Sequence, residues 1–293
     1  MRYTIENDQI KCEIDSHGAE LKSLIRKRDG REIMWSADPE FWNRTSPVLF
    51  PFVGGVKDKT YRHEGKEYSM SQHGFARDME FLPDSEGTGE IWFVLSDTEE
   101  SLKKYPFRFR LRIGYKLDNA SVKVMWEVEN TNAGGMWFAI GAHPGFALEE
   151  LLRSAFYLYD KAGSLVSKID NRIFGSGGCV TDRTVEIPLS EGRLVVSEEL
   201  FDNDALVLEN GQIGRVELVD GDNELIVAVS FDAPLVGLWS PPHKKAPFVC
   251  IEPWYGRCDS DSFEGELKNR DYEQYLDAGK TFRAEYVISV CRL

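Results

Sequence analysis

The sequence predicts an all-β protein, built as a large antiparallel twisted β-sandwich, and three observations support that fold class. A long central stretch alternates apolar and polar residues with a period of two, as a strand with one buried face does. Short apolar runs elsewhere are separated by turn pairs such as Asp-Gly and Glu-Gly. Helical patterns are almost absent, so strands must form the layers that enclose the core.

Residues 107–128 carry the clearest strand pattern. In residues 107–117 every second side chain is apolar, and the residues between them are arginine, glycine or lysine. The alternation resumes at Val122 and continues to Val128, after the turn pair Asp118-Asn119. Two alternating runs around a turn pair predict a long antiparallel hairpin.

Three shorter hairpins follow from turns between other apolar runs. Asp29-Gly30 marks the first turn, Glu64-Gly65 the second, and the polar residues 220–223 the third. Residues 281–293 form one further predicted strand. Many strands joined by short turns are typical of a sandwich.

One short helix is predicted, within residues 96–105. Ser96 offers a hydroxyl as its N-cap, and Glu99 stands three residues further on, which is the spacing of a capping box. Pro106 follows the predicted end of the helix, as expected of a residue that cannot donate a helical hydrogen bond.

The bulk properties fit one globular domain over residues 1–293. Hydrophobic residues make up 42% of the chain and charged residues 29%, which allows a sizeable core, and no stretch resembles a linker. The net charge of −14 argues against nucleic acid or an anionic membrane as a partner, because both would repel this surface. A neutral small molecule in a local pocket is unaffected by that argument.

The expected compartment is the cytoplasm. The sequence shows no apolar run of signal-peptide or membrane-spanning length. The five cysteines are scattered and contain no C-x-x-C pair, which predicts reduced thiols and neither a disulfide framework nor a zinc site. Without a His-rich or Cys-rich cluster, a phosphate loop or a G-x-G-x-x-G motif, metal and nucleotide sites have no support. Oligomeric state is left open.

Glu252 is the strongest candidate for a general base. It ends the apolar run "PFVCIE" of a predicted buried strand and is followed by Pro253, Trp254 and Tyr255. Burial beside aromatic rings raises a carboxyl pKa, and a raised pKa suits a base that works near neutral pH. The alternative is a strand-end glutamate held by an arginine or by backbone N–H groups. Position alone leaves the two interpretations even.

His143 and His73 are candidates for proton transfer. Pro144 restricts the backbone of His143 to extended conformations and so fixes the direction of its ring. His73 stands beside Gly74 in a loop. Imidazole can give or take a proton near pH 7. For either residue alone, a turn histidine bonded to the main chain is the favoured interpretation.

Arg44, Arg77 and Asp204 are candidates for holding a ligand. Both arginines have apolar neighbours in the sequence, and a partly buried guanidinium needs acceptors. A structural salt bridge is slightly favoured over a substrate contact for each. Asp204 could accept hydrogen bonds from hydroxyls, with Asp202 as a nearby rival and the capping of a turn as the alternative for both.

Three motifs in order, "QHGFAR", "GAHPGF" and "CIEPWYG", resemble the aldose 1-epimerase (galactose mutarotase) family, and its LacX-like subgroup in particular. The resemblance covers nearly the whole chain. It implies the galactose mutarotase-like supersandwich with an open sugar cleft. It also implies interconversion of the α and β anomers of an aldose without a cofactor.

The resemblance also implies a role for each candidate. Glu252 would remove the proton from the anomeric O1 hydroxyl, His143 would protonate the ring oxygen O5, and His73 would hydrogen-bond the sugar near O5. Arg44 and Asp204 would hold sugar hydroxyls, on looser matches. Arg77 is expected behind His73. From their places beside these loops, Trp254, Trp42 and Trp239 could offer apolar faces to the sugar ring, with a role in the core as the alternative.

Departures from the family pattern leave the substrate open. Gly145 stands where galactose-type members carry tyrosine, a change expected inside the cleft. A sister group acts on hexose 6-phosphates, and here Arg44, Arg77 and Lys57 could form a phosphate pocket.

Two functions of other classes also remain. A sugar-binding or sensing protein would not need a positioned acid and base, so the intact His73, His143 and Glu252 argue against it. A glycoside hydrolase would use Glu252 and Asp204 as its carboxylate pair.

Overall fold

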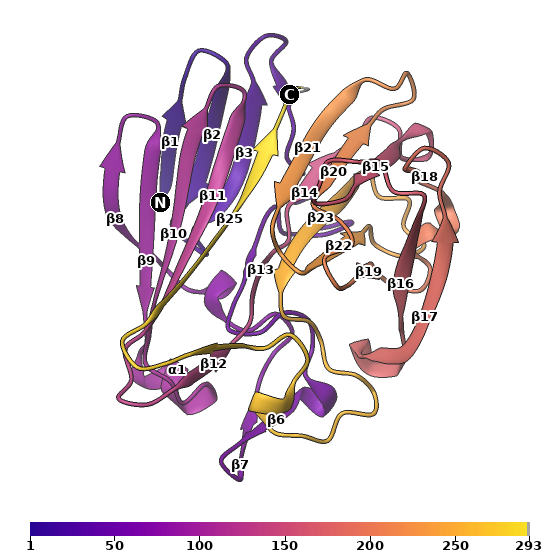
Figure 1. Ribbon diagram of the computed structural model, residues 1–293. Helices are drawn as coiled ribbons and strands as arrows, with labels where there is room; N and C mark the ends of the chain where they lie inside the picture. Colours follow the sequence, from indigo (N-terminus) through magenta and orange to yellow (C-terminus); the bar gives the residue numbers. More distant parts are fainter. Residues whose placement is uncertain (292–293) are drawn as a thin grey trace.

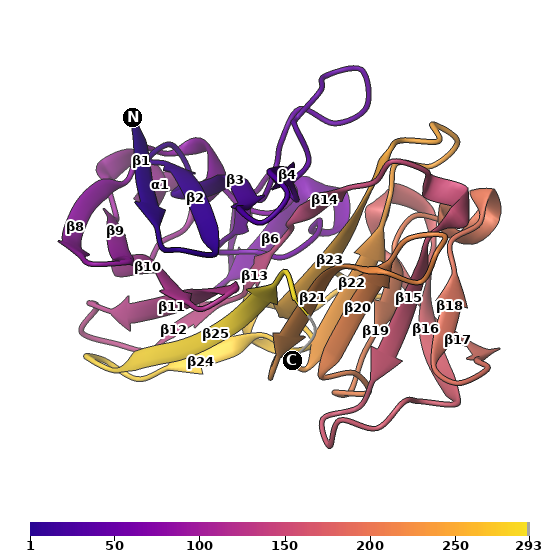
Figure 2. The ribbon, with the colours of Figure 1, turned by 90° about the horizontal axis from the view of Figure 1, so that it is seen from above.

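Antiparallel pairing joins the strands of the computed structural model, which describes residues 1–291 apart from the side chain of Glu198. Two large sheets and one smaller sheet form the layers, and Figures 1 and 2 show them from two directions. The predicted all-β fold class and its antiparallel sandwich are therefore confirmed.

The largest sheet has nine strands and runs through both halves of the molecule (Figure 1). In spatial order its strands are β18 (Arg193–Val195), β15 (Ala155–Tyr159), β20 (Arg215–Val219), β21 (Leu225–Phe231), β25 (Thr281–Ser289), β11 (Ser121–Asn130), β10 (Phe109–Asp118), β9 (Glu90–Ser96) and β8 (Leu82–Gly87). β25 joins the two halves because it pairs with β21 on one side and with β11 on the other.

The second large sheet has eight strands and holds the functional residues described below. Its order is β17 (Val180–Pro188), β16 (Lys168–Phe174), β19 (Leu206–Leu208), β22 (Leu235–Trp239), β23 (Phe248–Tyr255), β13 (Ile140–Ala142) and β5 (Val48–Leu49), with β14 (Gly145–Ala147) also paired to β23. β23 is thus a central strand with neighbours on both edges.

A four-stranded sheet covers the N-terminal half of the nine-stranded sheet, as Figure 2 shows. Its strands are β1 (Arg2–Glu6), β2 (Ile10–Asp15), β3 (Glu20–Arg26) and β4 (Arg31–Glu32). The ring of Tyr3 lies edge-on to Phe93 with centroids 5.2 Å apart, and the Tyr115 hydroxyl donates to the Ala19 carbonyl at 2.6 Å. These contacts join the two layers through the core.

The remaining elements are short. They are the pairs β6 (Thr60–His63) with β7 (Lys66–Ser69) and β12 (Met136–Phe138) with β24 (Gln274–Leu276), the helix α1 (Glu99–Lys104), and the 3-10 turns η1 (Lys57–Lys59), η2 (Ala76–Asp78), η3 (Leu151–Arg153), η4 (Ser176–Gly178), η5 (Glu198–Phe201) and η6 (Leu267–Asn269).

All four predicted hairpins are confirmed. β10 pairs with β11 from Phe109 opposite Asn130 to Asp118 opposite Ser121, so the turn consists of Asn119 and Ala120, one residue beyond the predicted pair Asp118-Asn119. The other three are β3 with β4, β6 with β7, and β20 with β21. β25 confirms the predicted C-terminal strand as far as Ser289, while residues 292 and 293 of that prediction lie outside the described residues.

The predicted helix exists, but its predicted cap is wrong. Ser96 is still part of β9, where it pairs with Arg110, so its backbone is extended. Thr98 is the N-cap instead: its hydroxyl accepts from the Ser101 N–H at 3.1 Å, and the Ser101 hydroxyl accepts from the Thr98 N–H at 2.8 Å. The capping box therefore has serine, not Glu99, at its third position.

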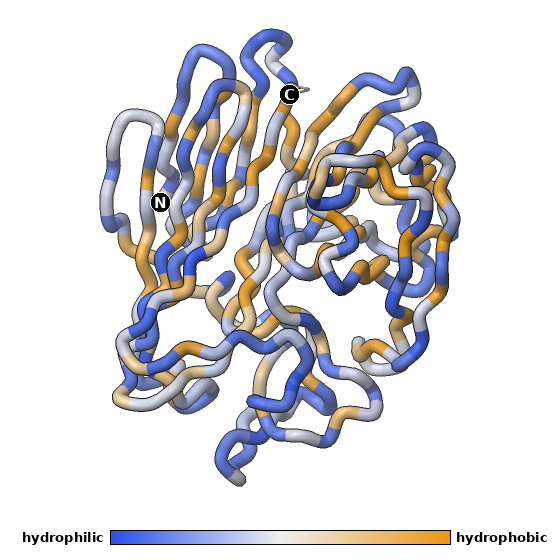
Figure 3. The backbone as a smooth tube through the Cα atoms, viewed as in Figure 1, coloured by the Kyte–Doolittle hydropathy of each residue, from blue (hydrophilic) through white to orange (hydrophobic). Residues whose placement is uncertain are grey.

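β23 is buried on both faces. Val249 and Ile251 belong to the main core between the sheets, whereas Cys250 and Trp254 belong to separate apolar clusters. Since neighbouring side chains of a strand point to opposite faces, Cys250, Glu252 and Trp254 share the face away from the main core. Figure 3 shows how hydrophobic and hydrophilic residues are distributed along the backbone.

Two further predictions concern the whole chain. Among residues 1–291, no helix combines the length and the apolar character that a membrane span requires. All five cysteines are free, and all but Cys291 are buried.

Candidate active site

A cavity of about 410 Å³ opens at the eight-stranded sheet, and its volume falls in the range of small-molecule sites. It brings together all seven residues singled out from the sequence, although they come from five separate stretches of the chain. They are Arg44, His73, Arg77, His143, Asp204, Glu252 and Trp254.

Glu252 lies inside β23 and not at the end of a strand, so that part of the prediction is wrong. The strand continues to Tyr255 because β22 still pairs with it, with Val236 opposite Pro253. On its other edge the ladder is interrupted, since β13 ends at Ala142 and β14 begins at Gly145. This interruption lies opposite the middle of β23, where Glu252 is.

His143 occupies the interruption and therefore meets Glu252. Its Nε2 lies 3.3 Å from Glu252 Oε2, and both side chains are more than nine-tenths buried. The ring of Trp42 stacks on the imidazole at a centroid distance of 4.7 Å, and Trp239 meets it edge-on at 5.3 Å. Two aromatic neighbours thus fix the plane of the ring.

Burial controls the charge of this pair. It raises the pKa of Glu252 well above its usual value, and the nearby Asp204 carboxylate raises it further. Burial also lowers the pKa of His143 to about 3, with Arg77 adding to the effect. Both shifts favour the uncharged form of the pair, a protonated carboxyl beside a neutral imidazole. Glu252 Oε2 and His143 Nδ1 have no hydrogen-bond partner among the described residues.

His73 faces the same cavity as a hydrogen-bond donor. Its backbone N–H donates to the Gly54 carbonyl at 2.8 Å, and the Gly54 N–H donates back to the ring Nδ1 at 3.1 Å. Burial holds the pKa of His73 well below its usual value, so the ring is neutral. Because Nδ1 accepts, the remaining proton lies on Nε2.

Glycine is required beside His73. Gly74 has a φ of +70°, and a Cβ there would collide with the carbonyl of Phe50. The backbone of His73 is also left-handed, with a φ of +66°. Two successive left-handed residues turn the chain and direct the imidazole into the cavity.

The two arginines line the cavity and have protein partners as well. Arg44 Nη2 lies 2.7 Å from Asp78 Oδ1, which is the predicted salt bridge, and Arg77 Nη2 donates to the Gln72 carbonyl at 2.8 Å. The Nε of Arg77 is buried without a hydrogen-bond partner among the described residues. Burial, together with Arg44, lowers the pKa of Arg77 to about 10.

Asp204, and not its rival Asp202, lies at the cavity. Asp204 Oδ1 accepts from the N–H of the following residue, Ala205, at 2.8 Å, and no turn is capped by this contact. Asp202 contacts His243 instead, with 3.1 Å between Oδ1 and Nδ1. Asp204 therefore lies where its carboxylate could meet a ligand, whereas Asp202 does not.

Two glycines that the sequence analysis passed over make room for Trp254. A Cβ on Gly141 of β13 would lie 2.6 Å from Trp254 Cδ1, and a Cβ on Gly237 of β22 would collide with the other end of the indole. The ring thus lies across both neighbouring strands. Glycine inside an apolar strand is the signal that could have found them. The indole N–H of Trp254 is buried and has no hydrogen-bond partner among the described residues.

Gly145 was expected inside the cavity, but it lies behind the residues that line it. A Cβ there would lie 3.1 Å from Trp35 Cβ and 3.3 Å from the Trp42 ring. Trp42 is the residue that stacks on His143. Gly145 therefore affects the site indirectly, because its lack of a side chain leaves room for the Trp42 ring.

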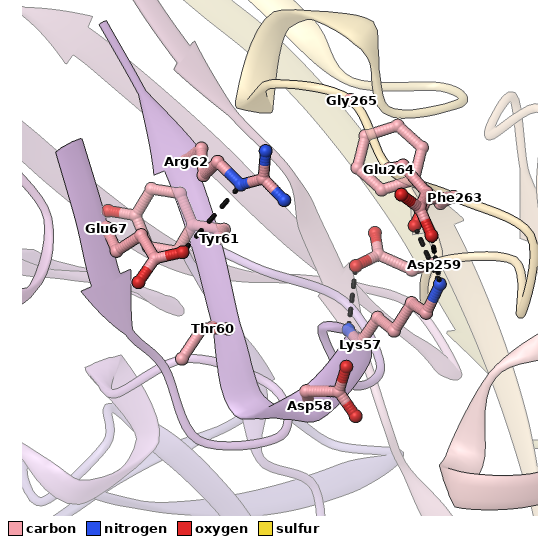
Figure 4. A pocket seen from close by; sticks show the side chains of 10 residues that line it. All are labelled: Lys57, Asp58, Thr60, Tyr61, Arg62, Glu67, Asp259, Phe263, Glu264 and Gly265. Atoms are coloured by element: carbon pink, nitrogen blue, oxygen red, sulfur yellow. Dashed lines mark hydrogen bonds and ion pairs between the residues drawn. The ribbon is translucent and has the colours of Figure 1, made fainter. Parts of the chain in front are cut away.

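Lys57 does not reach the cavity, so the expected contribution of Lys57 to a phosphate pocket is wrong. Its Nζ lies 3.2 Å from the Phe263 carbonyl and 3.4 Å from Glu264 Oε1. These contacts lie in a separate pocket of about 120 Å³, shown in Figure 4. The backbone N–H of Lys57 donates to Asp259 there at 2.8 Å, which fixes this direction of the chain.

The chain is similar to known proteins over nearly its whole length. A family model described as aldose 1-epimerase matches residues 1–289. The protein LacX of Lactococcus lactis is 30% identical over 268 residues, which cover 87% of this chain and 88% of that protein.

Solved structures agree with that match. A galactose mutarotase related enzyme from Lactobacillus acidophilus superposes with a TM-score of 0.93 at 35% identity, over 100% of this chain and 98% of the other. A galactose mutarotase-like protein from Lactobacillus casei gives 0.92 at 30% identity, over 99% of both chains. The expected galactose mutarotase-like sandwich is thereby confirmed.

Proposed function

The chain belongs to the aldose 1-epimerase family, and we propose that it interconverts the α and β anomers of an unphosphorylated hexose. The observation that carries the proposal is the buried contact between Glu252 Oε2 and His143 Nε2, 3.3 Å apart at the cavity. A base and an acid in contact are what opening of a sugar ring needs.

Ring opening takes a proton from the O1 hydroxyl and gives one to O5. Both oxygens are bonded to C1, so two side chains in contact can reach both from one side of the sugar. Burial keeps the resting proton on Glu252, and its transfer to His143 across the contact changes no net charge. Glu252 then accepts the O1 proton while His143 protonates O5, the C1–O5 bond breaks, and an aldehyde forms.

Ring closure reverses these steps on the other face. The aldehyde turns about the C1–C2 bond and O5 attacks C1 again. His143 takes the proton from O5, and Glu252 returns a proton to O1. The pair holds one proton before and after each step, so the cycle consumes nothing.

The remaining residues bind and orient the sugar in this proposal. His73 donates its Nε2–H near O5, where charge changes during the reaction. Among the residues that the structure describes, the buried Nε–H of Arg77 has no hydrogen-bond partner and would pair with a sugar oxygen, as would the indole N–H of Trp254 beside Glu252. Arg44 and Asp204 would hold further hydroxyls at the cavity wall.

An unphosphorylated sugar suits the charges of the cavity. Arg44 is paired with Asp78, and Arg257 Nε with Glu209 Oε1 at 2.6 Å. Asp204 adds a negative charge to the wall, and Lys57 is directed elsewhere. A phosphate would meet few uncompensated cations here, so the hexose 6-phosphate alternative is disfavoured.

The test is anomer exchange, measured by NMR saturation transfer with glucose, galactose and glucose 6-phosphate in parallel. We expect acceleration with a free hexose, and a rate about 10²–10⁴-fold lower for Glu252→Gln. Faster exchange of glucose 6-phosphate would assign the phosphorylated substrate instead. Binding of sugars without any acceleration would leave a sugar sensor. Release of nitrophenol from nitrophenyl glycosides would indicate a glycoside hydrolase.

A further inference from the structure

A third potential metal ligand lies beside the Glu252–His143 pair. Cys250 stands two residues before Glu252 in β23, so its thiol lies on the same face of the strand. One ligand atom each of His143, Cys250 and Glu252 lies within 4.8 Å of the others, and all three residues are buried. The sequence hides this group because His143 comes from a distant strand.

The spacing suits a tetrahedral metal ion. Two nitrogen or oxygen ligands about 2.0 Å from zinc lie about 3.3 Å from each other in a tetrahedron. His143 Nε2 and Glu252 Oε2 are 3.3 Å apart. The thiol lies within 4.8 Å of both atoms, whereas the ideal separation in a tetrahedron is about 3.5 Å, so metal binding has to draw the Cys250 side chain closer.

Both the donor set and the hydrogen bonding favour a soft cation. Thiolate, imidazole and carboxylate together bind Zn²⁺ or Cd²⁺, whereas Mg²⁺ and Ca²⁺ prefer oxygen ligands. Glu252 Oε2 has no hydrogen-bond partner among the described residues although its side chain is almost completely buried. Glu252 Oε2 faces His143 Nε2 at 3.3 Å, where one cation could bridge the two atoms, and the cavity leaves room for a fourth donor from water or sugar.

We propose that His143, Cys250 and Glu252 form a site for one thiophilic divalent cation, Zn²⁺ or Cd²⁺, which blocks the proposed base and acid. The inhibitory consequence rests on the proposed epimerase function, whereas the binding itself does not. A bound cation prevents catalysis, because it occupies the lone pairs of His143 and Glu252 that proton transfer uses.

Binding is tested with Cd²⁺ alone, added to the chelator-treated full chain. The readout is the ultraviolet charge-transfer band of cadmium thiolate, which needs no enzyme activity. We expect one equivalent of Cd²⁺ to saturate the band in the wild type, and Cys250→Ala to remove it. Cys258→Ala is the matched control, since Cys258 is a second buried cysteine at the cavity. The cadmium–thiolate band should remain in the Cys258→Ala variant.

Inhibition is tested by adding Zn²⁺ or Mg²⁺ to the anomer-exchange assay. Each variant is compared with its own metal-free rate. We expect Zn²⁺ to inhibit the wild type, Cys250→Ala to need at least tenfold more Zn²⁺, and Mg²⁺ to have no effect. A cadmium band that is absent, or that survives Cys250→Ala and disappears in Cys258→Ala, would overturn the site. Absence of any exchange, with the band intact, would instead overturn only the proposed function.

Discussion

At the scale of single residues, the contact between Glu252 and His143 depends on where each side chain leaves its strand. Glu252 projects from the middle of a central strand, and His143 fills the gap between β13 and β14 opposite it. Both side chains are more than nine-tenths buried, and burial disfavours the charged form of each. The site thus holds a proton that can move between two atoms without a change in charge.

Replacement of His143 separates catalysis from binding. His143→Asn keeps a polar side chain of smaller size but removes the group that gives a proton to O5. We expect kcat to fall about 10²–10⁴-fold and the Michaelis constant to change far less. The measurement is the exchange rate as a function of sugar concentration. An equal loss in binding would make His143 a contact residue and not the acid.

The pH dependence follows from the shifted pKa values. A free histidine would lose its proton near pH 6.5, but the pKa of His143 is lowered to about 3, and that of Glu252 is raised. The pair gains a second proton only in strong acid and loses its single proton only above the raised pKa of Glu252. We therefore expect kcat/KM to stay flat from pH 5 through neutrality and to fall on the alkaline side. A limb near pH 6.5 would contradict this assignment.

At the scale of elements, glycines in the strands beside β23 decide where Trp254 lies. Gly141 and Gly237 have no side chain to compete with the indole, which spreads over both neighbouring strands. An aromatic side chain so placed gives the cavity a rigid apolar wall with one N–H donor. The geometry of the sheet therefore shapes the sugar site directly.

Gly237→Ala tests this arrangement. The added methyl group would collide with the Trp254 ring, so we expect a loss of about 1–3 kcal/mol in stability and a raised Michaelis constant. Urea unfolding and anomer exchange measure the two effects. Gly87→Ala in β8 is the control, because its Cβ would have no atom within 4 Å. Equal behaviour of the two variants would show that the ring moves aside without cost.

Hairpins and helices depend mainly on residues that are neighbours in the sequence, so most of them can be predicted from it. The β10–β11 hairpin follows from alternation and its turn, since both signals lie within neighbouring residues. The cap of α1 was missed because Ser96 and Thr98 offer similar hydroxyls, and only the length of β9 decides between them. The motif resemblance pointed to seven of the residues that line the cavity, whereas the direction of Lys57 depends on Asp259, more than two hundred residues away.

At the scale of the whole molecule, long-range pairing could not be predicted from the sequence. β25 lies between β21 and β11, and nothing in its own residues selects those neighbours. The same is true of Cys250 and His143, which come together only through the order of β23, β13 and β14. The fold class is thus predictable from local patterns, and the metal-ligand group is not.

A buried charge network beside the cavity links pH to global stability. Arg270 is 1% exposed and donates to Asp259 Oδ1 at 2.6 Å and to Glu273 Oε2 at 2.7 Å. Asp259 also accepts the backbone N–H of Lys57, close to the loop that positions His73. Burial raises the pKa of Glu273 from 4.5 to about 7, although Arg270 opposes the shift.

Glu273→Gln tests the energetic cost of that burial. Between pH 4.5 and 7 the folded protein holds a proton on Glu273 that the unfolded chain has lost, so this residue makes stability fall as pH rises. A shift from 4.5 to about 7 corresponds to roughly 3 kcal/mol at about 1.4 kcal/mol per pKa unit. Glutamine does not titrate. Urea unfolding should therefore show the variant gaining up to that amount, relative to the wild type, between pH 4.5 and 8. The exposed Glu149→Gln makes the same chemical change at the surface and should gain nothing comparable. A constant difference between Glu273→Gln and the wild type across this range would mean that Arg270 keeps Glu273 ionised throughout.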